Sequence, residues 1–247
     1  MADACRILRE RLATVAASML GVPAETLRFA DSAVHATDGR SVAFSAVTLQ
    51  AWMRRVNMSA SGFYATPGVA YDHATGSGTP FFYFAYGGCI TEVEINGLTG
   101  EYRLRAADII HDVGDSLVPN IDRGQIEGAY VQGAGWLTCE EVLFTADGRL
   151  LTHGPSTYKI PAAGDAPIDF RVELLDDAHQ DTVIGGSKAV GEPPFMLAIS
   201  VITAMHHAIA SFGMPGAEVE LSIPATPEAV LRATAAIQPA AKAEAAR

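Results

Sequence analysis

Apolar residues recur at three- and four-residue spacing at the start of the chain, which predicts an amphipathic helix over residues 3–20. Gly21 and Pro23 follow the last apolar position and are expected to end this helix. The apolar face of the predicted helix carries Cys5, Leu8, Leu12, Val15 and Met19.

Alternating and short apolar runs bounded by turn residues predict strands along the rest of the chain. A second helix, over residues 46–56, is expected to begin after Ser45 as its N-cap, and residues 66–80 read as a loop. The predicted strands span residues 26–29, 33–37, 41–44, 81–86, 89–95, 102–113, 169–175, 181–184 and 218–223, and residues 144–151 are expected to form a hairpin.

Three further helices are predicted, over residues 122–144, 195–211 and 226–237. The middle one is apolar nearly all round, so we expect it to be deeply buried. The first contains glycines, which cost about 1 kcal/mol each in a helix relative to alanine. They indicate that a ligand or a packed neighbour approaches the backbone closely, and the sequence leaves both readings open. Helices and strands intermingle without regular βαβ alternation, so the predicted fold class is α+β.

Composition narrows the class of protein. The 247 residues are enough for one large domain or two small ones, and with 49% hydrophobic and 18% charged residues the chain is expected to fold. A net charge of −11 and the lack of a basic patch argue against nucleic-acid binding. Cys5, Cys89 and Cys139 are too scattered for a disulfide framework, and neither a signal peptide nor an apolar run of membrane-spanning length is visible. We therefore expect a cytoplasmic protein without membrane contact.

Candidate chemistry centres on residues 185–194, with the sequence GGSKAVGEPP. The small residues permit close approach, and the two prolines stiffen the entry into the following helix. Glu192 is the one carboxylate at this joint and is a candidate general base. The alternative is an ordinary loop that starts a helix with an acidic residue at its N-terminus. The histidines are scattered without metal-ligand spacing, so no protein metal site is predicted.

Three motifs, in order, resemble those of the molybdenum hydroxylases, in the xanthine dehydrogenase and aldehyde oxidase branch. Residues 187–194 (SKAVGEPP) resemble the loop that carries the catalytic glutamate of that family. Residues 124–133 (GQIEGAYVQG) are similar to its cofactor-side helix, and residues 154–162 (GPSTYKIPA) to its third signature. The resemblance runs from about residue 4 to residue 233.

This resemblance implies a role for four residues. Glu192 would act as the base that takes the proton from the molybdenum-bound hydroxyl, whose oxygen comes from water. Gln125 would hydrogen-bond the molybdopterin, Lys188 would contact the cofactor or order the loop, and Gly191 would allow close approach. Lys159 and Gln132 are expected to be structural. The implied reaction is hydroxylation of an electron-poor carbon in a purine, taking hypoxanthine and xanthine to urate, or alternatively in an aldehyde or another N-heterocycle.

The resemblance also implies an incomplete enzyme. Residues 1–237 would be the C-terminal portion of a molybdopterin-binding domain, residues 238–247 a flexible tail, and Met1 a truncation or an internal start. In the family, upstream residues provide much of the cofactor cradle, and 2Fe-2S clusters and FAD lie on other segments or subunits. The expected partners are therefore a small-molecule substrate, an iron–sulfur/FAD subunit or segment, and further copies in an oligomer. A non-catalytic fragment that serves only as an interface remains the alternative.

Overall fold

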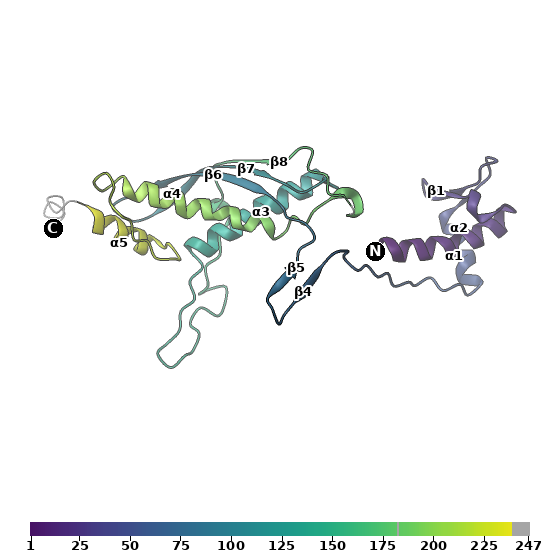
Figure 1. Ribbon diagram of the computed structural model, residues 1–247, viewed down its shortest axis with the longest axis horizontal. Coiled ribbons are helices and arrows are strands. Elements are labelled where there is room, and N and C mark those ends of the chain that lie inside the picture. Colours follow the sequence, from purple (N-terminus) through teal and green to yellow (C-terminus); the bar gives the residue numbers. More distant parts are fainter. Residues whose placement is uncertain (182, 239–247) are drawn as a thin grey trace. The chain divides into compact units, whose positions relative to one another are not determined.

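The computed structural model describes residues 1–181 and 183–238, and the chain divides into two compact units, Met1–Phe82 and Tyr83–Arg247 (Figure 1). Each unit has its own hydrophobic core. Of the expected tail, residues 238–247, all but Gln238 lie outside the described residues. The grouping of residues 1–237 into one domain remains a prediction.

The first unit packs two helices against a small sheet. Helix α1 (Ala2–Leu20) and helix α2 (Phe44–Met53) lie against three antiparallel strands in the order β1 (Arg28–Ala30), β2 (Ala33–His35) and β3 (Ser41–Ala43). A short 3₁₀ helix, η1 (Ala24–Thr26), connects α1 to β1. The buried residues of this core are Leu12, Val15, Ala16, Leu27, Val34, Ala36, Val47 and Ala51.

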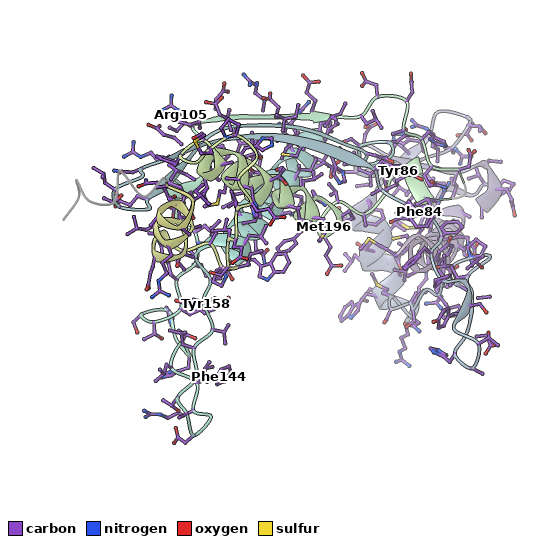
Figure 2. The ribbon with its side chains drawn as sticks, turned by 60° about the vertical axis from the view of Figure 1, so that its left-hand side comes forward. Phe84, Tyr86, Arg105, Phe144, Tyr158 and Met196 are labelled. Atoms are coloured by element: carbon purple, nitrogen blue, oxygen red, sulfur yellow. The ribbon has the colours of Figure 1, made fainter. Side chains whose placement is uncertain are left out.

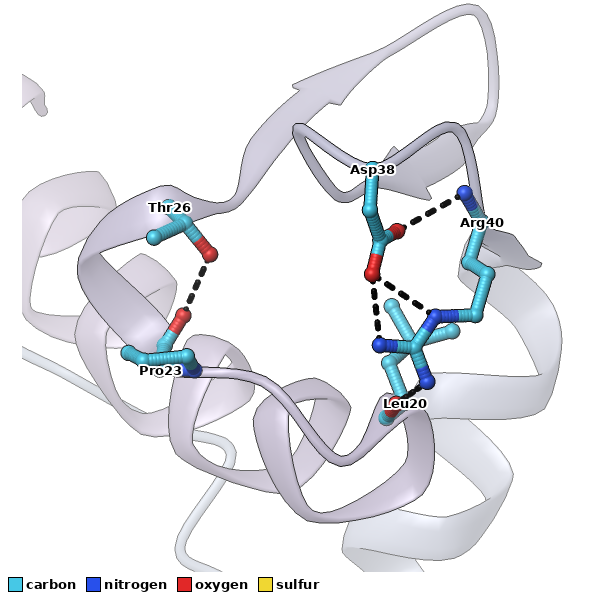
Figure 3. A network of polar contacts seen from close by, with 5 residues as sticks. All are labelled: Leu20, Pro23, Thr26, Asp38 and Arg40. Carbon is cyan, nitrogen blue, oxygen red and sulfur yellow. Dashed lines mark hydrogen bonds and ion pairs between the residues drawn. The ribbon is translucent and has the colours of Figure 1, made fainter.

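The predicted amphipathic helix is confirmed, with Leu12 and Val15 buried and Gly21 ending α1 in the left-handed conformation at φ 67°. Cys5, which the spacing placed on the apolar face, is exposed. Arg40 ties the hairpin to the end of this helix, because its guanidinium pairs with Asp38 and donates to the Leu20 carbonyl (Figure 3).

Two expectations for this unit were wrong. Helix α2 starts at Phe44, with Ala43 rather than Ser45 at the N-cap and without a side-chain cap. The predicted loop over residues 66–80 contains a two-stranded hairpin, β4 (Ala70–Asp72) with β5 (Ser77–Thr79). Its strands are three residues long and fully exposed, so no hydrophobic alternation reveals them.

The second unit is built on a mixed sheet of three strands in the order β6 (Gly87–Ile95), β7 (Tyr102–His111) and β8 (Asp169–Leu174). Strand β7 pairs antiparallel with β6 and parallel with β8, and a bulge at Glu92/Val93 shifts the β6 register. The remaining elements are α3 (Pro119–Thr138), η2 (Ala163–Asp165), η3 (Ile184–Gly186), η4 (Pro193–Ala198), α4 (Ile199–Ala210) and α5 (Pro227–Ile237). The mixed sheet with packed helices confirms the α+β class.

The two faces of this sheet differ in chemistry. The inner side chains of β7, such as Leu104 and Ile109, pack with Tyr130 of α3 and Met205 of α4 in one core (Figure 1). The outer face is charged and carries exposed ion pairs between Arg171 and Asp108 and between Arg105 and Glu94 (Figure 2). The alternation of side chains along each strand produces this difference.

Helix α3 is shorter than predicted. It ends at Thr138, and residues 139–162 leave the body as an extended arm that carries Phe144 and Tyr158 (Figure 2). The expected hairpin within the arm is present as a bridge between Phe144 and Leu150, and Tyr158 donates to Glu140 over 2.6 Å at the base.

The expected strands over residues 81–86, 181–184 and 218–223 are absent from the described residues. Their apolar composition is typical of a strand, but the strands of the described residues lie elsewhere in the chain. Gly185 and Gly186, both at positive φ, turn the chain at the end of the second segment.

The segment Pro193–Ala210 differs from expectation in two ways. It is long and apolar enough to cross a membrane by length and composition alone, contrary to the sequence reading. Its burial is one-sided: Val201, Met205 and Ile209 enter the core, whereas Ile199 is 48% exposed. Because three of its large side chains form the core beneath the sheet, core packing accounts for much of its apolar composition.

The glycines of α3 separate into two kinds. A Cβ at Gly133 would lie 2.6 Å from the Phe195 carbonyl oxygen and 2.7 Å from Ala198 Cβ, whereas a Cβ at Gly128 would meet nothing within 4 Å. We therefore expect Gly133→Ala to lower the free energy of unfolding by about 1–3 kcal/mol. Gly128→Ala, the matched control, should raise it by up to about 1 kcal/mol through helix propensity. Urea denaturation of both variants measures the difference, and equal shifts would contradict the packing described.

Candidate functional site

The loop that carries Glu192 begins in a tight backbone contact. Gly114, at φ 63°, forms an antiparallel bridge with Ser187, and a Cβ at Gly114 would lie 2.3 Å from the Gly186 carbonyl oxygen. That carbonyl accepts hydrogen bonds from the Asp115 amide at 2.9 Å and the Gln180 amide at 3.0 Å. The loop therefore lies directly on the segment that follows β7.

Successive residues then hold the loop in place. The Lys188 amide donates to the Val113 carbonyl at 2.8 Å, and the Ala189 amide donates to the Tyr83 hydroxyl at 2.8 Å. Val190 packs against the hydrophobic core, and Pro194 is buried at the start of η4. These contacts restrict the backbone on both sides of Gly191 and Glu192.

A buried ion pair lies beneath the loop. Lys188 Nζ lies 2.5 Å from Asp112 Oδ2, and the two side chains are 8% and 2% exposed. Lys188 Nζ also donates to the Phe84 carbonyl at 3.0 Å, and the Gly114 amide donates to Asp112 Oδ1 at 2.9 Å. Burial alone would raise the pKa of Asp112, but the hydrogen bonds from Lys188 and Gly114 hold it below its usual value.

Glu192 itself is exposed. It precedes η4 with φ −94° and ψ −39°, and its carbonyl accepts the Phe195 amide at 3.0 Å. Its carboxylate makes no hydrogen bond or ion pair with other residues that the structure describes. A rigid backbone with an unengaged carboxylate is suited to accept a proton from a bound molecule.

Gln125 lies beside this loop. It is exposed on α3, and a Cβ at Gly191 would lie 3.8 Å from Gln125 Oε1. A Cβ placed at Gly124 or at Gly128 would have no neighbouring atom within 4 Å, so both positions face open space. The structure thus brings Gln125 and Gly191 together, next to Glu192, whereas the Lys188 ammonium is engaged by Asp112 and Phe84.

Sequence reasoning missed the residues that support the loop. Asp112 was not singled out, although an acidic residue at the end of an apolar strand is a usable signal. His179 lies on the other side of the loop, with Nδ1 at 2.6 Å from Asp115 Oδ2 and Nε2 at 3.5 Å from Asp181. His111 was treated as one of several scattered histidines, but burial lowers its pKa, and its Nδ1 has no partner within the described part of the chain.

A separate cavity of about 860 Å³ lies at the opposite end of the sheet. Its lining includes Glu94, Tyr102, Cys139 and Lys159, and none of its residues belongs to the Glu192 loop or to the part of α3 that carries Gln125. No group of three histidine, cysteine or carboxylate side chains in the described residues could hold a metal ion. Glu192 and Gln125 therefore lie at the open surface of the loop and not in this cavity.

Comparison with known proteins gives the family. A family model described as the molybdopterin cofactor-binding domain matches residues 1–167, which include Asp112 and Gln125 and end before the Glu192 loop. The chain belongs to this family of molybdenum hydroxylases. It is 52% identical over 172 residues to xanthine dehydrogenase from Dictyostelium discoideum, and 43% identical over 205 residues to xanthine dehydrogenase from Oryza sativa subsp. japonica. The two alignments cover 68% and 79% of this chain, but 13% and 15% of the relatives.

Solved structures confirm the fold of the molybdenum hydroxylase family. Quinoline 2-oxidoreductase from Pseudomonas putida 86 matches with a TM-score of 0.64 and 28% identity, over 95% of this chain and 29% of that one. The Cu,Mo-CO dehydrogenase matches with a TM-score of 0.63 at 17% identity, which supports the fold alone. The family's molybdenum–pterin cofactor fits the surface found here, because Gln125 offers both a donor and an acceptor and the glycines beside it leave room for a flat ligand.

The hydrogen bond to Asp115 raises the pKa of His179 above its ordinary value of 6.5. The stabilising contribution of this pair is therefore complete below that value and is lost as the pH rises through the folded-state pKa. We expect Asp115→Asn to return the His179 pKa toward 6.5. Asp181→Asn, the matched control on the other ring nitrogen, should lower it less, because Asp181 is the smaller influence. Titration of the ring protons by NMR measures both, and a larger effect of Asp181→Asn would contradict the geometry.

Proposed function

We propose that this chain forms one part of the cofactor site of a molybdenum hydroxylase that oxidises purines, taking hypoxanthine and xanthine to urate. The observation that carries the proposal is the meeting of Gln125 on α3 with the Gly191–Glu192 turn at one open surface. The names of the most similar relatives, xanthine dehydrogenases from several kingdoms, support the purine substrate. The chain spans 13–15% of their length, so the remainder of the enzyme would lie outside it.

The bound molybdenum–pterin group would supply the redox chemistry and the water-derived oxygen for hydroxylation. In this proposal the Glu192 carboxylate is the general base that accepts the proton as the oxygen attacks the electron-poor carbon. Gln125 holds the cofactor by its side-chain amide. Gly191 has no side chain, which lets the cofactor approach the backbone of the loop. Lys188 was assigned to cofactor contact from the sequence, but its ion pair with Asp112 favours the alternative of ordering the loop.

Exposed apolar side chains beside the site are evidence that a second polypeptide segment packs there and completes the cofactor site. Leu117, Val118 and Ile121 are 66%, 48% and 60% exposed just before Gln125, and Ile184 is 65% exposed at the start of the loop. Leu117 lies against the turn, 2.9 Å from a Cβ placed at Gly185. Contiguous exposed apolar residues around a site mark an interaction surface. We propose that upstream polypeptide of the complete enzyme covers them and that 2Fe-2S and FAD modules lie further along the same assembly.

The second candidate substrate class is an N-heterocycle other than a purine. Quinoline 2-oxidoreductase, at 28% identity, is named for an N-heterocycle that is not a purine. Both substrates present an electron-poor carbon next to nitrogen, so Glu192 would play the same part. Steady-state kinetics of the complete enzyme with xanthine and with quinoline separate the two, and a higher kcat/KM for quinoline would replace the purine assignment.

Glu192→Gln in the complete enzyme should lower turnover by about 10²–10⁴-fold, because the substitution removes the general base while the side chain keeps its size. The molybdenum and pterin content should stay unchanged. Glu173→Gln, on the exposed outer face of β8, is the control and should leave turnover unchanged. Loss of cofactor in Glu192→Gln, or full activity, would contradict the assignment.

Gln125→Ala should lower the molybdenum and pterin content of the purified complete enzyme, because the amide that holds the cofactor is missing. The matched control is Gln132→Ala, which removes an exposed amide two turns further along the same helix. Metal analysis of both variants measures the effect. Equal cofactor content would show that Gln125 is a surface residue.

A further inference from the structure

The ion pair between Asp112 and Lys188 is unusual in its setting. The outer-face pair of Arg171 and Asp108 has side chains 57% and 46% exposed, whereas Lys188 and Asp112 are 8% and 2% exposed. Removing two charges from water is costly, and apolar residues of similar volume are often as stable or more so. A contribution to net stability is therefore a weak explanation for this pair.

The pair joins three segments of the chain. Lys188 Nζ bonds Asp112 Oδ2 and the Phe84 carbonyl, and it lies 5.8 Å from the centre of the Tyr86 ring. Asp112 accepts the Gly114 amide through its other oxygen, and its own amide donates to the Tyr86 carbonyl at 2.8 Å. The carboxylate thus binds both the segment just after β7 and the Lys188 side chain of the loop, and the ammonium binds both Asp112 and the segment before β6.

The loop transmits this constraint to Glu192. Between Lys188 and Glu192, the Ala189 amide is bonded to Tyr83 and Val190 is packed in the core. After Glu192, two prolines fix the backbone, and Pro194 is buried. The backbone is therefore held on both sides of the short Gly191–Glu192 stretch.

We propose that Asp112 and Lys188 are positioning residues, whose buried ion pair fixes the loop so that Glu192 is held in place to accept its proton. This role rests on the proposed function of Glu192. A general base must lie within hydrogen-bond reach of its proton, and a misplacement of about 1 Å can cost on the order of 100-fold in rate.

Amide hydrogen exchange of the full chain tests the constraint without any cofactor. In Asp112→Asn the Lys188 charge stays buried without its partner, so the amides of Lys188 and Ala189 should exchange about 100-fold faster or more. The double variant Asp112→Asn/Lys188→Met removes both charges and should keep the fold, with the same two amides about 10-fold faster. Asp108→Asn is the matched control: it is the same substitution in an ion pair on the outer face of β7, the strand that Asp112 directly follows, and it should leave the loop unchanged.

The location of the change separates positioning from general stability. The amide of Ile109, in the centre of the sheet, should keep its exchange rate in the double variant. Wild-type rates at Lys188 and Ala189 in the double variant, or equal acceleration at Ile109, would overturn the proposal. If Asp112→Asn does not fold, the double variant alone decides.

The complete enzyme gives a second readout. The double variant should lower kcat by about 10-fold or more with KM and molybdenum content unchanged. Loss of folded protein would lower the molybdenum content together with kcat, so the unchanged metal content distinguishes positioning from unfolding. Unchanged kcat would overturn the proposal. Should Glu192→Gln remain fully active while loop exchange still depends on the ion pair, the base assignment fails and the constraint on the loop stands.

Discussion

A single buried ion pair connects two segments that are 76 residues apart in the sequence. Asp112 directly follows the central strand and Lys188 lies in the loop that leads to Glu192, so the bond between them joins the sheet to the glycine-rich loop. The Gly114–Ser187 bridge and the two amides on the Gly186 carbonyl depend on the same close approach. Once these contacts form, the position of the loop follows from the position of β7.

The second constraint is the packing of α3. Gly133 admits the Phe195 carbonyl, so η4 lies against α3 just after the Glu192 loop. The same helix presents Gln125 at its open end, where Gly124 and Gly128 leave the surface clear. One helix therefore uses its glycines in two ways, for close packing in its second half and for open space in its first. The sequence left close packing and ligand approach undecided; the structure shows close packing at Gly133, and ligand approach at Gly124 and Gly128 stays a prediction.

Regular periodicity made much of the fold predictable. The helix near the N-terminus, the β6 and β7 ladder, strand β8 and helix α5 follow from alternation or helical spacing, because one face of each is buried. Residues 181–184 and 218–223 have the composition of strands, but pairing depends on neighbours that composition does not reveal. Glu192 and Gln125 were found through motifs, not through periodicity. Asp112 was missed because its partner is distant in sequence, and only the folded chain brings the two together.

The central claim is that this chain carries one part of a divided cofactor site. The direct test is the molybdenum and pterin content of the chain purified alone and purified with an upstream segment of the family's molybdopterin-binding polypeptide restored. The account predicts cofactor in the restored form and little or none in the chain alone, since the proposed upstream segment would cover the exposed apolar surface around Gln125 only in the restored form. No cofactor in either form, with both folded, would contradict the account and favour a chain that serves only as an interface.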